Sequence, residues 1–160
     1  MAVDVVTHVE IARPRAEVFT YAADPGNAPE WYVNIEQVVW NTPPPVKLGS
    51  QVAFVAHFLG RRLSYTYAIV ELVPGERLVM RTAQGPFPME TTYSFESTPA
   101  GGTRMTLRNR GNPSGFSRLV APFLAAAMRR ANAKDLSRLK HLLETQAQAR
   151  TGEADEPPRR

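Results

Sequence analysis

Few residues of this chain have the type and spacing of a catalytic or metal site, and most of those that could react are expected at the protein surface. The three histidines, His8, His57 and His141, do not have the spacing of metal ligands. Two fall on the outward phase of strand-like segments and the third in a charged helical stretch, so we expect all three at the surface. The chain has no cysteine, which excludes thiolate metal sites and a cysteine nucleophile. We therefore predict no metal and no cofactor.

Motifs for nucleophilic or nucleotide chemistry are also missing from the sequence. It contains no G-x-S-x-G, no P-loop and no G-x-G-x-x-G. Asp24, Glu30, Glu71 and Glu76 lie at helix or turn boundaries, where capping and solvation account for them. A mechanism based on paired carboxylates is not indicated.

Hydroxyl and amide groups on the inner face of a predicted sheet are better candidates for a site. Buried groups of this kind need partners, which can be one another, the backbone, trapped water or a ligand. The sequence leaves these alternatives open. The set comprises Tyr65, Tyr67, Thr82, Thr91, Tyr93, Asn109 and Asn132.

Hydrophobic periodicity predicts the elements that position these groups. Alternation predicts a first strand over 3–12, and Pro14 ends it. Helical spacing after Pro14 predicts a helix that stops at Asp24, followed by a short helix near 28–32. Six alternating segments separated by turn signals then predict an antiparallel meander. These segments are 35–40, 52–58, 63–69, 77–82, 89–95 and 103–109.

The last predicted hairpin has a charged outer face. Pairing around its glycine turn places Glu96 near Arg104 and Glu90 near Arg110. Such cross-strand pairs stabilise a sheet by roughly 0.2–1 kcal/mol each. We interpret this face as a solvent-facing charge ladder.

The period returns to helical after the turn at 111–115. Pro122 lies inside the pattern and should split it into a short helix that ends at Ala121 and a long one from Pro122 to about Ala147. The remainder, 148–160, is polar and without periodicity, so we expect it to be disordered. The prediction is one domain over 1–147, which suits a chain of 160 residues.

The charge balance of the sequence limits which kinds of binding partner are expected. Basic residues outnumber acidic ones 19 to 15, a net charge of +4. The arginines are interleaved with acidic residues such as Glu90, Glu96 and Asp135, which favours a mixed, solvated surface over a nucleic-acid patch. No secretion signal and no apolar run of membrane-spanning length occur. We expect a cytoplasmic protein without nucleic-acid partners or integral membrane association, and the oligomeric state stays open.

These elements predict an α+β fold in which a curled antiparallel sheet of about seven strands grips the long helix. A curved sheet and one helix touch best at their rims, so a pocket is expected between them. Its predicted apolar lining also includes Phe116, outside the candidate ligand-binding set. That set is Phe54, Phe58, Tyr65, Tyr67, Met80, Met89, Thr91, Tyr93, Met105, Asn109, Phe123, Met128 and Asn132. For Trp31 we expect a place in the core.

The element order resembles the helix-grip fold of the START-like superfamily, and most closely its polyketide cyclase/dehydrase-like branch, the SRPBCC proteins. The similar stretches span roughly 3–145 and include VEIARPRAEVFTYAADPGNAPEW, KLGSQVAFVAHFLGRRLSYTYAIVELVPGERLVM, GPFPMETTYSFE with GGTRMTLRNRG, and FSRLVAPFLAAAMRRANAKDLSRLKHLLE. The resemblance implies a hydrophobic cavity, because related members bind lipids, sterols, quinones or polyketides. Some members catalyse ring closure and others assist partner proteins.

Three functions follow as hypotheses. The first is binding of a small hydrophobic or amphipathic molecule by a carrier, sensor or sequestering protein. The second is a polyketide cyclase or dehydratase, with Tyr67, Tyr93 and Asn109 as proton-relay and orienting groups. Related cyclases are thought to use Arg, Tyr, Asn or Asp inside the pocket, whereas Arg81, Arg104 and Arg108 are all expected to point outward here. The third is a partner-binding module without a ligand.

Overall fold

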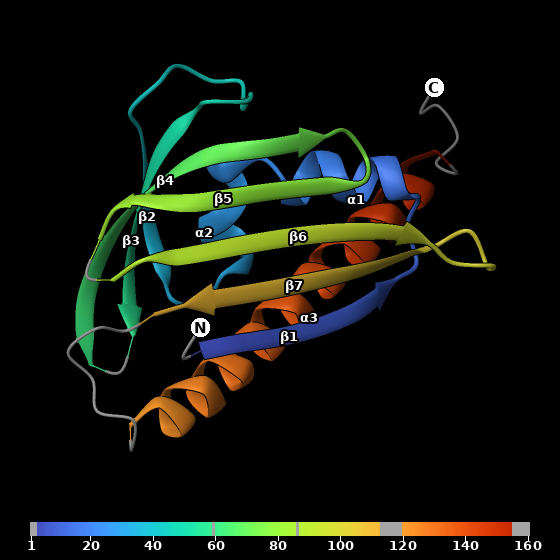
Figure 1. The fold of residues 1–160 in the computed structure, drawn as a ribbon. Helices are drawn as coiled ribbons and strands as arrows, with labels where there is room; N and C mark the ends of the chain where they lie inside the picture. The colour runs from blue at the N-terminus through green and yellow to red at the C-terminus, as the bar shows by residue number, and fades with distance from the viewer. Residues whose placement is uncertain (1–2, 59, 86, 113–119, 155–160) are drawn as a thin grey trace.

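The computed structural model describes residues 3–58, 60–85, 87–112 and 120–154. The chain forms a strand, three short helical segments, six strands and a long helix (Figure 1). The elements are β1 (Val3–Ile11), α1 (Arg15–Ala22), the 3-10 turn η1 (Pro25–Asn27), α2 (Ala28–Trp31), β2 (Ile35–Trp40), β3 (Gln51–Phe58), β4 (Arg61–Val73), β5 (Arg77–Gln84), β6 (Met89–Ser97), β7 (Thr103–Gly111) and α3 (Ala121–Ala154).

The seven strands form one antiparallel sheet in the order β1-β7-β6-β5-β4-β3-β2. Strands β2 to β7 each pair with their neighbours in sequence, which confirms the predicted meander. The first strand pairs with β7 instead, because α1, η1 and α2 carry the chain across to the far edge. Figure 1 shows α3 crossing one face of the curled sheet. The predicted helix-grip α+β fold is therefore confirmed.

The core lies where α3 meets the sheet. Leu136, Leu139 and Leu143 recur at helical spacing and are buried in one cluster with Ile11 and Met105. Trp31 is also fully buried in this cluster, as expected, and its ring lies 4.0 Å from that of Tyr32. One end of α3 is thus fixed by close packing, which leaves the other end to cover a cavity.

The outer face of the last hairpin has the predicted charge pairing. Glu90 is opposite Arg110 and Glu96 is opposite Arg104 in the register of β6 and β7. Glu90 also accepts a hydrogen bond from Nε of Arg81 at 2.7 Å. Arg81, Arg104 and Arg108 are all exposed, which confirms that these three arginines point outward.

Helix α3 differs from the prediction at its C-terminal end. It continues to Ala154, so residues 148–154, which we expected to be disordered, are helical. Their Gln, Ala, Arg and Glu residues are good helix formers, and an established helix propagates without an apolar stripe. Residues 155–160 lie outside the described residues, as do Phe116 and most of the predicted short helix before Ala121. Pro122 is in the first turn of α3, where its missing N–H is tolerated.

No helix in the described part of the chain combines the length and apolar character needed to cross a membrane.

Candidate functional site

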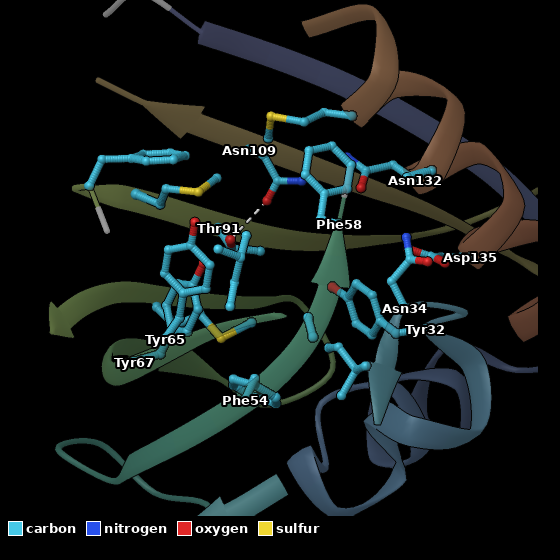
Figure 2. Close-up of a pocket in the computed structure, with 18 of the residues that line it drawn as sticks. Tyr32, Asn34, Phe54, Phe58, Tyr65, Tyr67, Thr91, Asn109, Asn132 and Asp135 are labelled. Atoms are coloured by element: carbon cyan, nitrogen blue, oxygen red, sulfur yellow. Dashed lines mark hydrogen bonds between the residues drawn. The ribbon is translucent and has the colours of Figure 1, made fainter. Parts of the chain in front are cut away.

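A cavity of about 160 Å³ lies between the sheet and α3 (Figure 2). Alternation along the strands directs every second side chain inward, and α3 closes the opposite side. An apolar cavity of roughly 150 Å³ already accommodates a benzene ring, so a larger ligand would also extend beyond this volume. The lining comprises Tyr32, Asn34, Ile35, Phe54, Ala56, Phe58, Leu63, Tyr65, Tyr67, Met80, Phe87, Met89, Thr91, Tyr93, Asn109, Leu124, Met128, Ala131, Asn132 and Asp135.

Most of the residues that the sequence suggested as ligand contacts line this cavity. Their contact with a ligand stays a prediction. Thr82, also expected on the inner face, is opposite Tyr67 in the register of β4 and β5. It accepts a hydrogen bond from the backbone N–H of Met89 at 2.9 Å and does not line the cavity. The cavity brings together Phe54, Phe58, Tyr65, Tyr67, Met80, Met89, Thr91, Tyr93, Asn109, Met128 and Asn132.

Two candidate residues do not line the cavity. Met105 is fully buried, but it is opposite Val9 and Phe95 in the core, away from the cavity. Phe123 is 76% exposed, so the prediction that it faces inward is wrong. Leu124, one position further along α3, takes the inward place, because successive helix residues point about 100° apart.

One polar group on the sheet side is satisfied internally. The Thr91 hydroxyl donates to Oδ1 of Asn109 at 2.8 Å, and both residues are buried (Figure 2). Tyr67 lies beside Thr91. Burial raises the pKa of Tyr67 to about 12, and its hydrogen bond with the Thr91 hydroxyl acts in the opposite direction. This wall therefore presents neutral hydroxyl and amide groups at neutral pH.

Tyr65 can lie against the end of β5 only because residue 85 is a glycine. A Cβ on Gly85 would come within 2.6 Å of Cδ1 of Tyr65. Any larger residue would displace the ring, so Gly85 helps to shape this wall of the cavity.

A second polar group joins the end of α2 to the sheet. The hydroxyls of Tyr32 and Tyr93 form a hydrogen bond with each other, and burial raises the pKa of both well above its ordinary value. The Trp31 ring packs edge-on against that of Tyr93, with their centroids 5.8 Å apart. The sequence does not indicate Tyr32 as a site residue, because its position depends on a contact with Tyr93, which is 61 positions away.

Asp135 differs most from its predicted position. The charge pattern favours a solvated surface position, but the residue is only 3% exposed and lines the cavity. Its Oδ1 accepts a hydrogen bond from the backbone N–H of Val33 at 2.9 Å. Burial raises its pKa to about 6, against the opposing effects of that hydrogen bond and of Arg138. Its spacing from Met128 and Asn132, seven and three positions, is the signal that places it on the inner face.

Asn132 contributes the donor that the protein leaves unused. The residue is 6% exposed and lines the cavity, and its Nδ2 has no hydrogen-bond partner among the described residues. A buried donor without a partner costs roughly 1–3 kcal/mol. A molecule in the cavity that offers an acceptor oxygen would remove this cost.

The histidines have the surface positions predicted for them. His8, His57 and His141 are exposed, and Nε2 of His57 lies 2.9 Å from Glu36. Across the ranges that the structure describes, no group of three His, Cys, Asp or Glu side chains could hold a metal ion.

The hydroxyl pair gives a first testable prediction. The hydroxyl of Tyr93 bonds to that of Tyr32, so we expect removal of either hydroxyl to affect stability. We expect Tyr93→Phe alone and Tyr32→Phe alone each to lower the free energy of unfolding by roughly 1–3 kcal/mol, because each leaves the other hydroxyl without its hydrogen-bond partner. The double variant should recover much of that loss. Urea unfolding of the four proteins measures the coupling, and strictly additive losses would contradict a direct bond.

Comparison with known proteins agrees with this architecture. The family model described as polyketide cyclase / dehydrase and lipid transport matches residues 2–144. A search of curated proteins gave no match.

Solved structures are similar over most of the chain. The Zhui aromatase/cyclase from Streptomyces sp. R1128 has a TM-score of 0.76 at 17% identity, covering 90% of this chain and 94% of that one. TTHA0849 from Thermus thermophilus also has a TM-score of 0.76, at 18% identity over 86% and 94% of the two chains. A START superfamily protein from Mycobacterium smegmatis has a TM-score of 0.70 at 15% identity, over 87% and 98%.

At such low identity the solved structures show a shared fold, whereas the family model covers nearly the whole helix-grip domain. The chain therefore belongs to the polyketide cyclase / dehydrase and lipid transport family.

Proposed function

We propose that the chain binds a small hydrophobic or amphipathic molecule in this cavity, as a carrier, sensor or sequestering protein. The proposal rests on an apolar cavity that is lined by Asn132. Nδ2 of Asn132 is a buried donor, and it has no hydrogen-bond partner among the described residues. Apolar walls supply affinity and a few polar groups supply orientation. The expected ligand has a ring or an acyl chain, and an acceptor oxygen placed near Asn132 would add to its affinity. The lipid transport in the family description supports the same proposal.

Ligand-dependent stabilisation tests this function. A compound that binds only the folded protein adds about 2.7 kcal/mol to the free energy of unfolding at 100 times its dissociation constant. We expect at least one class among fatty acids, sterols, quinones and flavonoid-like compounds to raise the melting temperature. Mass spectrometry of molecules that co-purify with the protein would identify the class directly. If no compound raises the melting temperature, ligand binding is contradicted.

A specific observation also favours a second candidate, a polyketide cyclase or dehydratase. The carboxyl of Asp135, whose pKa is raised to about 6, can donate or accept a proton near neutral pH. It lines the same cavity as Tyr67, Tyr93 and Asn109, the groups suggested for relay and orientation. One similar solved structure is an aromatase/cyclase. Conversion of a poly-β-ketone, with loss of turnover in Asp135→Asn, distinguishes this enzyme from a binding protein.

A further inference from the structure

We propose that a cationic groove beside the cavity holds the anionic head group of the ligand, so that the natural ligand is an amphipathic anion. The inference rests on the proposed binding function and specifies its ligand class. The head group is a carboxylate or a phosphate, since both offer the same negatively charged oxygens to cationic side chains.

The groove adjoins the cavity. It has a volume of about 280 Å³ and lies between the N-terminal half of α3 and the ends of β2 and β3. Asn34, Phe58 and Ala131 line both the groove and the cavity. A ligand whose apolar part fills the cavity therefore has the groove next to it as a place for its head group. The groove is lined by Val33, Asn34, His57, Phe58, Ala127, Arg130, Ala131 and Lys134.

Two uncompensated cations face this groove. Arg130 and Lys134 are four positions apart on α3, so they lie on one side of the helix, and both are exposed. Within the described ranges no carboxylate forms an ion pair with either. His57 is also in the groove, but Glu36 lies 2.9 Å from it and offsets any charge there. Arg130 and Lys134 are thus the groups that would bind the anionic head group.

The apolar end of the cavity disfavours an anion. Phe54 and Met80 line this end, and neither offers a donor or a positive charge to replace the water around a carboxylate or a phosphate. The orientation that suits both regions has the apolar end of the ligand against Phe54 and Met80 and the negative end beside Arg130 and Lys134. Figure 2 shows Phe54 away from Asn34, which also lines the groove.

A matched series of amphiphiles tests this inference. Dodecanoate, dodecyl phosphate and dodecan-1-ol have the same chain, and each would be titrated below its micellar concentration against bound N-phenyl-1-naphthylamine, a neutral fluorescent probe. We expect one or both anions to bind at least fivefold more tightly than the alcohol at low salt. That preference should shrink in 0.5 M salt, because screening weakens exposed charge pairs. The preferred anion shows whether the head group is a carboxylate or a phosphate.

Single-charge variants locate the effect. Arg130→Gln and Lys134→Gln should each weaken binding of the preferred anion by about two- to fivefold, the range of exposed ion pairs, and leave dodecan-1-ol unchanged. Arg129→Gln is the control, since Arg129 is exposed on the same helix but lines neither the groove nor the cavity.

Two results would contradict the proposal that the groove binds the head group, without contradicting ligand binding in the cavity. One is equal affinity for the alcohol and both anions in the wild-type protein. The other is a loss in Arg129→Gln as large as in Arg130→Gln and Lys134→Gln. Failure of the neutral probe and of all three amphiphiles to bind would instead overturn the proposed function together with the groove.

Discussion

Replacing Asp135 with asparagine is expected to raise the free energy of unfolding at pH 8 by up to about 3 kcal/mol. Burial raises the pKa of this carboxyl from an ordinary 3.8 to about 6. A difference of that size corresponds to about 3 kcal/mol against the ionised form in the folded protein. Asparagine removes the charge, and its side-chain oxygen can still accept the hydrogen bond from the Val33 N–H.

The pH dependence has a definite sign. A carboxyl whose pKa is raised in the folded state binds its proton more tightly there than in the unfolded chain. The free energy of unfolding therefore falls as the pH rises from about 4 to about 6. Above pH 6 the destabilisation is constant. Wild-type protein and Asp135→Asn should therefore differ little at pH 4 and by the full amount at pH 7 and 8.

Urea unfolding at intervals from pH 4 to 8 measures this difference, and subtraction removes the contributions of the other carboxyls. Glu10→Gln is the control, because its exposed position on β1 predicts a change within about 0.5 kcal/mol at each pH. A difference that does not vary with pH, or an asparagine variant less stable than wild type at pH 8, would show that Asp135 is not destabilised by burial.

Local patterns were enough to predict the sheet. Strand alternation and turn residues are short-range properties, and Gly75 and Gly101 have positive φ angles of 76° and 82° at two of the predicted turns. The same alternation fixed which strand residues face α3, so Phe54, Tyr65 and Thr91 line the cavity as expected.

The helical side of the site was harder to predict, because it depends on the rotation of α3 and on contacts distant in sequence. Phe123 and Leu124 are adjacent and both apolar, and only packing decides which one faces the sheet. Asp135 accepts a hydrogen bond from Val33, which is 102 positions away, and a charged side chain in a sequence is by default assigned to solvent. Tyr32 meets Tyr93 across a separation of 61 positions.

Filling the cavity tests the central claim that the ligand lies between the sheet and α3. Ala56 is on β3 and lines the cavity, whereas Ala53 is on the same strand, three positions away, and points to the opposite face. An indole ring in place of the Ala56 methyl group would occupy much of a cavity of about 160 Å³. Ala53→Trp adds the same ring outside it. Ala131→Met fills the cavity from the helix side.

The measurement is the dissociation constant of N-phenyl-1-naphthylamine, from fluorescence titration of proteins that unfold cooperatively. Binding inside the cavity predicts at least a tenfold weaker constant for Ala56→Trp, a smaller loss for Ala131→Met, and an unchanged constant for Ala53→Trp. Wild-type affinity in both Ala56→Trp and Ala131→Met would contradict a ligand site between the sheet and α3.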